Sequence, residues 1–214
     1  VVVITGAGDK AFCTGADASE VTDGGGYSKD LLTWHNRTHQ LIRDIPQPVI
    51  AAVNGYAVGA GHVLHTICDL TIASESAKFG QVGPRVGSFG MGFNSQYLIR
   101  LVGEKKAREI WYLCRLYTAQ EALEMGLINK VVPAGKLEEE VNTWCQEILA
   151  KSPGAISGLK LGFNADSSYL CGYESVGAQV TWAFWQGEEA AEGRKAYLEK
   201  REPDFARFRK CAST

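Results

Sequence analysis

Two glycine-rich segments of this chain lie where an apolar strand gives way to a turn, and they restrict the fold more than any other feature. Phe12–Asp17 reads FCTGAD, and Tyr56–Gly61 reads YAVGAG directly before a helical pattern. Small residues there let a ligand approach the backbone closely. Outward N–H groups and the positive end of a helix favour negative charge. Two such amides directed at one point would form an oxyanion hole, although each segment alone is also typical of an ordinary turn.

Runs of β-branched and apolar residues predict buried strands over Val1–Thr5, Pro48–Val53 and Asp69–Ala73. Apolar residues at helical spacing separate and follow these strands. Helices are predicted over Leu31–Ile45, His62–Cys68, Asn94–Leu101, Glu104–Leu116, Ala119–Met125, Leu137–Ser152 and Glu188–Arg201, with a short strand over Leu127–Val132. The glycine-rich stretch 77–92 is predicted to be irregular. Alternating strands and helices indicate an α/β fold whose last third is helical.

The composition excludes several classes of protein. A length of 214 residues is enough for a large core without disulfides, and a net charge of −2 argues against a nucleic-acid or polybasic membrane protein. No apolar run has the length of a membrane span. Six scattered cysteines without a CxxC motif predict neither disulfides nor a zinc site, so we expect no metal and a cytoplasmic location.

The two glycine-rich segments and their surroundings resemble the crotonase (enoyl-CoA hydratase/isomerase) superfamily over nearly the whole chain. The segments that carry the resemblance are FCTGAD, NGYAVGAG, ICDLTIAS and AKFGQVGP. Further stretches resemble 1,4-dihydroxy-2-naphthoyl-CoA synthases and, nearly as well, 2-ketocyclohexanecarboxyl-CoA hydrolases. These stretches are GHVLHTICDLTIA, VGEKKAREIWYLCR and KREPDFARF.

The resemblance implies the crotonase (ClpP-like) fold of repeated ββα units with a helical C-terminal oligomerisation region. We expect the acyl-CoA site in a core over residues 1–145 and a trimerisation region over residues 146–214. Members of the superfamily begin with one further strand-helix-strand portion. Because this chain starts without Met on an apolar strand, we expect that this N-terminal portion is missing from it.

The resemblance also assigns the substrate and its binding groups. The carbonyl oxygen of an acyl-CoA thioester would lie between the backbone N–H groups of Ala16 and Ala60, where most members have glycine at the second position. Thr14 and Asp17 would lie beside the CoA chain, and Lys200 would bind the CoA phosphates of an adjoining subunit. Asp17 is equally typical of a turn cap, and Lys200 of a solvated helix face.

The acid–base groups of a simple hydratase are absent from the sequence. Hydratases carry two glutamates, and the matching positions here are Val63 and Gly83, so addition of water to a double bond is disfavoured. In a subgroup of naphthoyl-CoA synthases a bound bicarbonate serves as the base instead. Its counterpart ligands here are Gln81, the amide of Gly83, and Trp111, although Trp111 is also compatible with a place in the core.

Two further positions depart from the synthases. Gly90 replaces an aspartate that assists proton transfer, and Trp185 replaces a C-terminal tyrosine that reaches a neighbouring active site. Tyr27 and Ser88 match catalytic positions, and each is also compatible with a purely structural role. These departures disfavour ring closure. Hydrolysis or carbon–carbon cleavage of a related cyclic β-keto thioester is compatible with them better, but it is also weakened, because the hydrolases keep the aspartate too.

Three functions therefore remain open. The leading one is synthase-like carbon–carbon chemistry on a cyclic or aromatic acyl-CoA by a homotrimer or a hexamer (a dimer of trimers). The alternatives are a ring-cleaving β-oxoacyl-CoA hydrolase and a non-catalytic acyl-CoA-binding homologue. His62 and His65 are expected to be structural histidines of a helix rather than metal ligands, and His35 and His39 to lie on a solvated or partly buried helix face.

Overall fold

The computed structural model describes residues 1–16 and 29–209, and its first sheet contains the predicted strands. This sheet comprises β1 (Val2–Thr5), β3 (Val49–Val53), β5 (Leu70–Ser74) and β8 (Lys130–Val132) in the order β1-β3-β5-β8, all parallel. Every residue of β3 is buried, as expected for a central parallel strand that is covered on both faces. The predicted strands are thus confirmed, with shifts of one to three residues at their ends.

A second sheet was not predicted from the local sequence pattern. It comprises β2 (Ala11–Cys13), β4 (Tyr56–Val58), β6 (Lys78–Gly80) and β7 (Tyr117–Thr118), with only β7 antiparallel. The expectation of irregular chain throughout 77–92 was therefore wrong at β6. Strands of two or three residues are too short to show a period-two alternation of apolar residues.

The predicted helices are confirmed, and the C-terminal region contains longer helices than the sequence pattern indicated. The helices are α1 (Lys29–Asp44), α2 (Ala60–Ile67), α3 (Gln96–Val102), α4 (Glu104–Leu113), α5 (Ala119–Glu124), α6 (Leu137–Leu149), α7 (Pro153–Ala165), α8 (Leu170–Trp185) and α9 (Glu188–Leu198), with the 3₁₀ turns η2 (Gly83–Val86) and η3 (Ala206–Phe208). Local signals fix several helix starts: Ser152 caps α7, whose first residue is Pro153. The expected domain boundary at residue 145 lies within α6.

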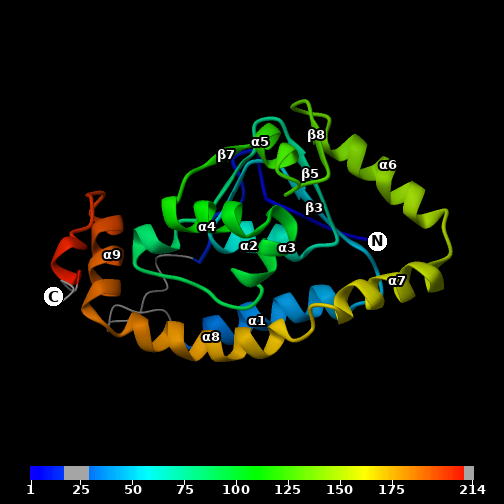
Figure 1. The fold of residues 1–214 in the computed structure, drawn as a ribbon. Coiled ribbons are helices and arrows are strands. Elements are labelled where there is room, and N and C mark those ends of the chain that lie inside the picture. Colours follow the sequence, from blue (N-terminus) through cyan, green and yellow to red (C-terminus); the bar gives the residue numbers. More distant parts are fainter. Residues whose placement is uncertain (17–28, 210–214) are drawn as a thin grey trace.

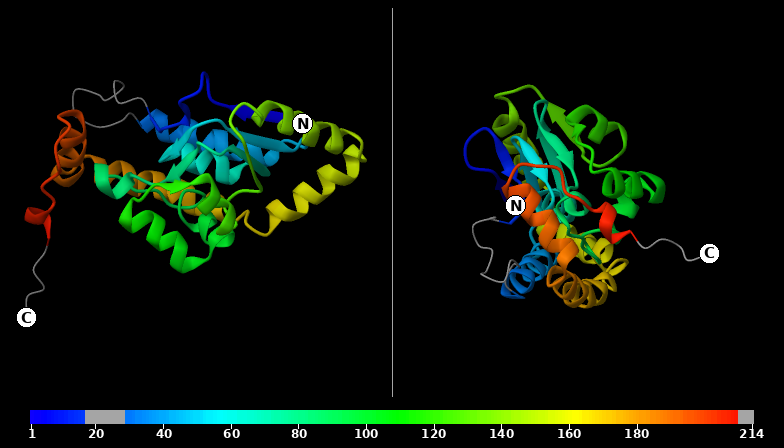
Figure 2. Two further views of the ribbon diagram at one scale, coloured as in Figure 1. Left: turned by 90° about the horizontal axis from the view of Figure 1, so that it is seen from above. Right: turned by 90° about the vertical axis from the view of Figure 1, so that its left-hand side faces the viewer.

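The C-terminal helices extend along the sheets and beyond them (Figure 1). Helices α1 and α8 lie side by side below the sheets, and α6 packs against β3 and β5. Both Figure 1 and Figure 2 show α9 at the opposite end of the molecule from α6 and α7. Helix α9 packs against η2 and α8. None of the helices in the described part of the chain is long and apolar enough to cross a membrane.

One buried lysine joins the helical region to the sheets. Lys160 on α7 is only 6% exposed, and its Nζ donates to the carbonyls of Ile42 at 2.8 Å and Gln47 at 2.9 Å. The same Nζ is 2.7 Å from Oδ2 of Asp69, and that oxygen also accepts from the backbone N–H of Val49 at 2.7 Å. This cation thus connects α7 to the end of α1 and to the starts of β3 and β5.

Replacing this lysine is expected to destabilise the fold strongly. Lys160→Met removes the counter-charge of Asp69 and the donor of two carbonyls, and we expect the free energy of unfolding to fall by roughly 3 kcal/mol. Urea unfolding measures this. Lys136→Met, which removes an exposed ion pair with Glu139, is the matched control and is expected to cost much less, because water already screens that pair. Equal losses in the two variants would contradict the role given to Lys160.

Candidate functional site

The two glycine-rich segments lie together because β2 and β4 are neighbouring parallel strands. Ala11 pairs with Tyr56 and Cys13 with Ala57, with an irregularity in register between the two pairs. A Cβ atom at Gly61 would lie 1.8 Å from the carbonyl oxygen of Cys13, which is far inside any allowed contact. Only glycine therefore lets the start of α2 pack directly on the end of β2.

The expected oxyanion residues lie at this junction. Ala60 is the first residue of α2, and the preceding Gly59 provides no side-chain cap. The first N–H groups of a helix have no acceptor within it, so the amide of Ala60 is open to an outside acceptor. A Cβ added at Gly15 would lie 3.9 Å from the Ala60 nitrogen, so the backbone at Gly15 passes close to the start of α2. Ala16 is the next residue along the chain. The fold thus brings the two segments side by side.

Of the residues expected to bind CoA, Thr14 and Lys200 lie in the described part of the chain. Thr14 is exposed at the end of β2, and its carbonyl oxygen would lie 4.0 Å from a Cβ at Gly59. Asp17 and Tyr27 lie outside the described residues, so their roles stay predictions. Lys200 is exposed in the turn after α9.

Gln81 and Gly83, two of the residues expected to bind an anion, come directly after β6. Gly83 begins η2, and a Cβ there would lie 2.8 Å from the carbonyl oxygen of Ser88 and 3.0 Å from Cζ3 of Trp111. Gly83 and Trp111 are therefore in contact. The Nε1 of Trp111 is buried and has no hydrogen-bond partner among the described residues. A buried N–H without an acceptor costs about 1–3 kcal/mol, which an added acceptor at this point would relieve.

Gln81, the third expected anion ligand, is buried and already engaged. Its Nε2 lies 3.2 Å from Nδ1 of His62 on α2, and both side chains are fully buried. Burial lowers the pKa of His62 to about 3, so the imidazole stays neutral and accepts the bond from Gln81. His62 thus holds Gln81, a role that its helical spacing did not indicate. Within the described ranges, no group of His, Cys, Asp and Glu side chains is arranged to hold a metal.

The two departures from the synthase pattern have visible structural consequences. Trp185 on α8 donates from Nε1 to Oγ of Ser88 in the same chain at 3.1 Å. A Cβ at Gly90 would lie 2.6 Å from Cβ of Asn94, so the Asn94 side chain fills the space that a side chain at position 90 would need. Val63, at a position where hydratases carry glutamate, is buried in the core.

The sequence pattern did not indicate the buried acid Glu174, which lies beside Asn94. Glu174 on α8 is 1% exposed, and its Oε1 lies 2.6 Å from Nδ1 of His39 and 3.4 Å from Nδ2 of Asn94. Burial raises the pKa of Glu174 to about 8 and lowers the pKa of His39 to about 4, so at pH 7 the pair is largely neutral. The expectation that His39 lies on a solvated or partly buried face was wrong, because its side chain is only 1% exposed and bonds to Glu174 of α8.

Comparison with known proteins finds a matching family model and similar solved structures. The family model described as enoyl-CoA hydratase/isomerase matches residues 1–208. An enoyl-CoA hydratase from Mycobacterium avium subsp. paratuberculosis K-10 is 30% identical with a TM-score of 0.83, covering 95% of this chain and 79% of that one. An enoyl-CoA hydratase from Bacillus anthracis is 34% identical with a TM-score of 0.69, covering 94% and 79%. A methylmalonyl-CoA decarboxylase in complex with 2-nitronate-propionyl-CoA is 26% identical with a TM-score of 0.79, covering 96% and 81%.

Proposed function

The chain belongs to the enoyl-CoA hydratase/isomerase family, and on that premise we propose that it makes or breaks a carbon–carbon bond next to the thioester of a cyclic or aromatic acyl-CoA. Its crotonase fold and its membership of a family of acyl-CoA-processing enzymes are established by the matches above. The proposal of synthase-like chemistry is carried by one observation. The two positions where hydratases have glutamates hold a core valine, Val63, and a glycine packed on an indole ring, Gly83.

The enolate of the thioester would be stabilised by backbone amides. The N–H groups of Ala16 and Ala60 would donate to the thioester oxygen, and the positive end of α2 would favour the negative charge that develops there. This assignment is supported by the closeness of the two segments, since a Cβ added at Gly15 would lie 3.9 Å from the Ala60 nitrogen. Losing one such donor typically costs roughly 3 kcal/mol of transition-state stabilisation.

The residues around Gly83 fit a small anion such as bicarbonate. The buried Nε1 of Trp111 needs an acceptor, and the Gly83 amide begins a 3₁₀ turn, so both N–H groups are available to an anion. Gln81 would contribute through the part of its amide that His62 does not engage. Bound bicarbonate would supply the base that the side chains at Val63 and Gly83 do not provide. Ser88, held by Trp185, would contact the reacting end of the substrate, and Tyr27 would act there as an acid.

The CoA portion would be bound by Thr14, Asp17 and Lys200. The exposed Lys200 supplies a point charge that suits a phosphate.

Incubation with a panel of cyclic and aromatic acyl-CoA esters, with and without bicarbonate, tests the proposal. We expect mass spectrometry to detect a product that has lost water, as ring closure of o-succinylbenzoyl-CoA requires, at a rate that depends on bicarbonate. A product that has gained water and opened its ring would identify a β-oxoacyl-CoA hydrolase instead. Calorimetric binding without any turnover would identify a non-catalytic acyl-CoA-binding homologue. Turnover that is indifferent to bicarbonate would contradict the anion base.

Assembly into a homotrimer, or a hexamer as a dimer of trimers, is part of the proposal. Helices α7 and α8 form the outer edge of the molecule in Figure 1, and they carry large exposed apolar side chains. These side chains include Leu159, Leu161, Phe163, Val176 and Val180. Phe163 is 76% exposed, and apolar surfaces of this kind mark interfaces.

A charge placed on this face is expected to disrupt the assembly. Phe163→Glu would bring a carboxylate into an apolar contact between copies, and desolvating it there is costly. We expect light scattering after size exclusion to give a trimer or hexamer mass for the wild type and a lower mass for the variant. An unchanged mass would place the interface elsewhere, and a monomeric wild type would contradict the assembly itself.

A further inference from the structure

Helix α9 packs on η2 with backbone-to-backbone contact. A Cβ at Gly193 would lie 2.5 Å from the backbone nitrogen of Gly87 and from the carbonyl carbon of Val86. In the other direction, a Cβ at Gly87 would lie 2.9 Å from Cα of Ala190. No flexible side chain separates the two segments, so any shift of α9 displaces the backbone that follows Gly83.

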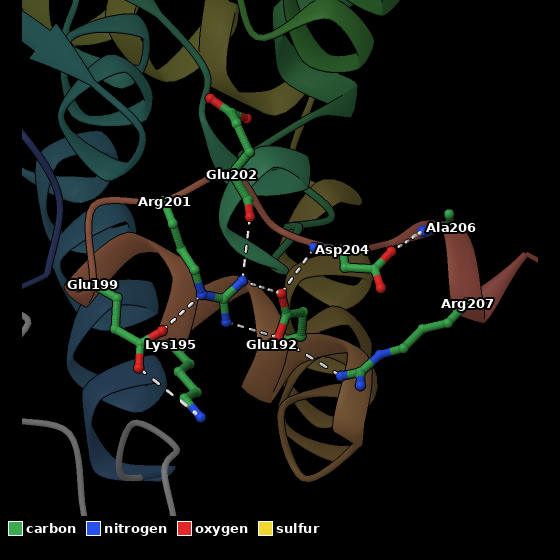
Figure 3. A network of polar contacts seen from close by, with 8 residues as sticks. All are labelled: Glu192, Lys195, Glu199, Arg201, Glu202, Asp204, Ala206 and Arg207. Atoms are coloured by element: carbon green, nitrogen blue, oxygen red, sulfur yellow. Dashed lines mark hydrogen bonds and ion pairs between the residues drawn. The ribbon is translucent and has the colours of Figure 1, made fainter.

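A network of polar contacts around Glu192 links α9 to the chain that follows it (Figure 3). Glu192 is 8% exposed, and its two carboxylate oxygens accept from Nη1 and Nη2 of Arg201 at 2.6 and 3.0 Å. The backbone N–H of Asp204 donates to it at 2.8 Å, and Nη2 of Arg207 lies 3.6 Å away. The hydrogen bonds from Arg201, then that from Asp204, lower the pKa of Glu192 to about 2. The carboxylate therefore stays charged at working pH.

The chain reverses sharply to bring Arg201 back to this carboxylate. The N–H of Arg201 donates to the carbonyl of Ala196 at 3.0 Å, and that of Lys200 to Tyr197 at 3.2 Å, which is the Schellman arrangement. Lys200 has a φ of 53°, a left-handed conformation that glycine usually supplies at this point. The turn thus carries backbone strain, and the bonds between Arg201 and Glu192 hold it in place.

A second link runs from α9 to Ser88. Nη2 of Arg194 donates to the carbonyl of Trp185 at 3.0 Å, and Nε1 of Trp185 donates to Oγ of Ser88 at 3.1 Å. The residues at both ends of segment 83–88 therefore depend on α9. The contact at Gly87 reaches Gly83 through the N–H of Ser88, which donates to the Gly83 carbonyl at 2.8 Å, and Ser88 is also linked to α9 through Trp185.

We propose that Glu192 is a positioning residue that fixes segment 83–88, and with it the Gly83 amide and the Ser88 hydroxyl, by locking α9 through Arg201. The catalytic importance of that segment rests on the proposed function. Glu192 itself acts only through α9.

Hydrogen exchange of two amides tests this without any substrate. The N–H of Val86 donates to Val82 at 3.1 Å and that of Ser88 to Gly83 at 2.8 Å, so both are protected while the segment keeps its place. In Glu192→Gln we expect at least tenfold faster exchange at these amides and unchanged exchange in β3. Glu188→Gln, an exposed acid on the same helix, is the matched control and is expected to leave both regions unchanged.

Unchanged exchange in segment 83–88 would overturn the proposal, and so would an equal rise in β3, which would indicate general destabilisation. If Glu192→Gln does not fold, Arg201→Gln breaks the same contact from its more exposed side and is expected to give the same local rise. Where turnover is found, we expect the bicarbonate concentration at half-maximal rate to rise at least fivefold while KM for the acyl-CoA changes less than twofold. Faster local exchange in a protein that turns over no thioester would leave Glu192 as proposed and reject only the catalytic function.

Discussion

Gly61→Ala is expected to lower kcat/KM for any acyl-CoA substrate at least a hundredfold. The added Cβ would lie 1.8 Å from the carbonyl oxygen of Cys13, and neither backbone can yield without separating the end of β2 from the start of α2. The amides of Ala16 and Ala60, which we propose to donate to the thioester oxygen, would then be moved apart, and misplacements of about 1 Å at a reacting centre can cost a hundredfold in rate. Steady-state kinetics with the best substrate of the panel measures this.

The matched control is Gly154→Ala in the first turn of α7. A Cβ at Gly154 meets no atom within 4 Å, so we expect unchanged kinetics and a gain in stability of at most about 1 kcal/mol. Urea unfolding of both variants separates loss of the site from loss of the fold. A Gly61→Ala protein that is folded and retains a third or more of its activity would show that the two amides do not act together.

Acid is expected to unfold the protein between pH 6.5 and pH 4. Burial is the main cause that lowers the pKa of His35 to about 3, of His39 to about 4 and of His62 to about 3, and it puts His65 well below its usual value. Below pH 6.5 the histidines bind protons in the unfolded chain but stay neutral in the folded chain. Stability is therefore lost as the pH falls, by up to about 1.4 kcal/mol per pH unit for each histidine.

Glu174 acts in the opposite direction. Its folded pKa of about 8 lies above the ordinary value of 4.5, so its contribution to stability is present below pH 4.5 and is lost as the pH rises through 8. Between pH 6 and 4.5 it offsets one histidine, which leaves a net loss of about 4 kcal/mol per pH unit. Urea unfolding at half-unit steps of pH measures the slope.

Glu174→Gln removes this opposing contribution while keeping the shape of the side chain. We expect its stability to fall more steeply with acid than that of the wild type, by about 1.4 kcal/mol per pH unit. A wild-type stability that stays level from pH 7 to pH 5 would contradict the burial of the histidines. Equal slopes in the two proteins would contradict the raised pKa of Glu174.

The parts of the fold that were predictable are those with a local physical signal. The β-branched run Val49–Val53 can be read as a buried strand because neighbouring residues carry the information. Ser152 was predicted to end a helix, whereas in the structure it caps the start of α7. The strands β2, β4 and β6 carry no comparable signal. Their pairing depends on contacts between residues far apart in the chain.

The candidate site divides in the same way. Glycines at Gly59 and Gly61 indicate a close backbone approach, so the junction of β2 and α2 could be inferred from the sequence together with its resemblance to the superfamily. The bond between His39 and Glu174 spans 135 positions, and neither residue type is unusual in a helix. The contact between Glu192 and Arg201 crosses a left-handed turn at a lysine, where a glycine is the ordinary sequence signal.

The pairing of β2 with β4 has a consequence for the way the protein reaches its working form. The two halves of the junction come from separate parts of the chain, and parallel neighbours of this kind must close a long loop before any contact between them is gained. Helices such as α4 and α6 form from nearby residues and close no such loop. After dilution from denaturant, helical signal is therefore expected to return before the ability to bind a thioester.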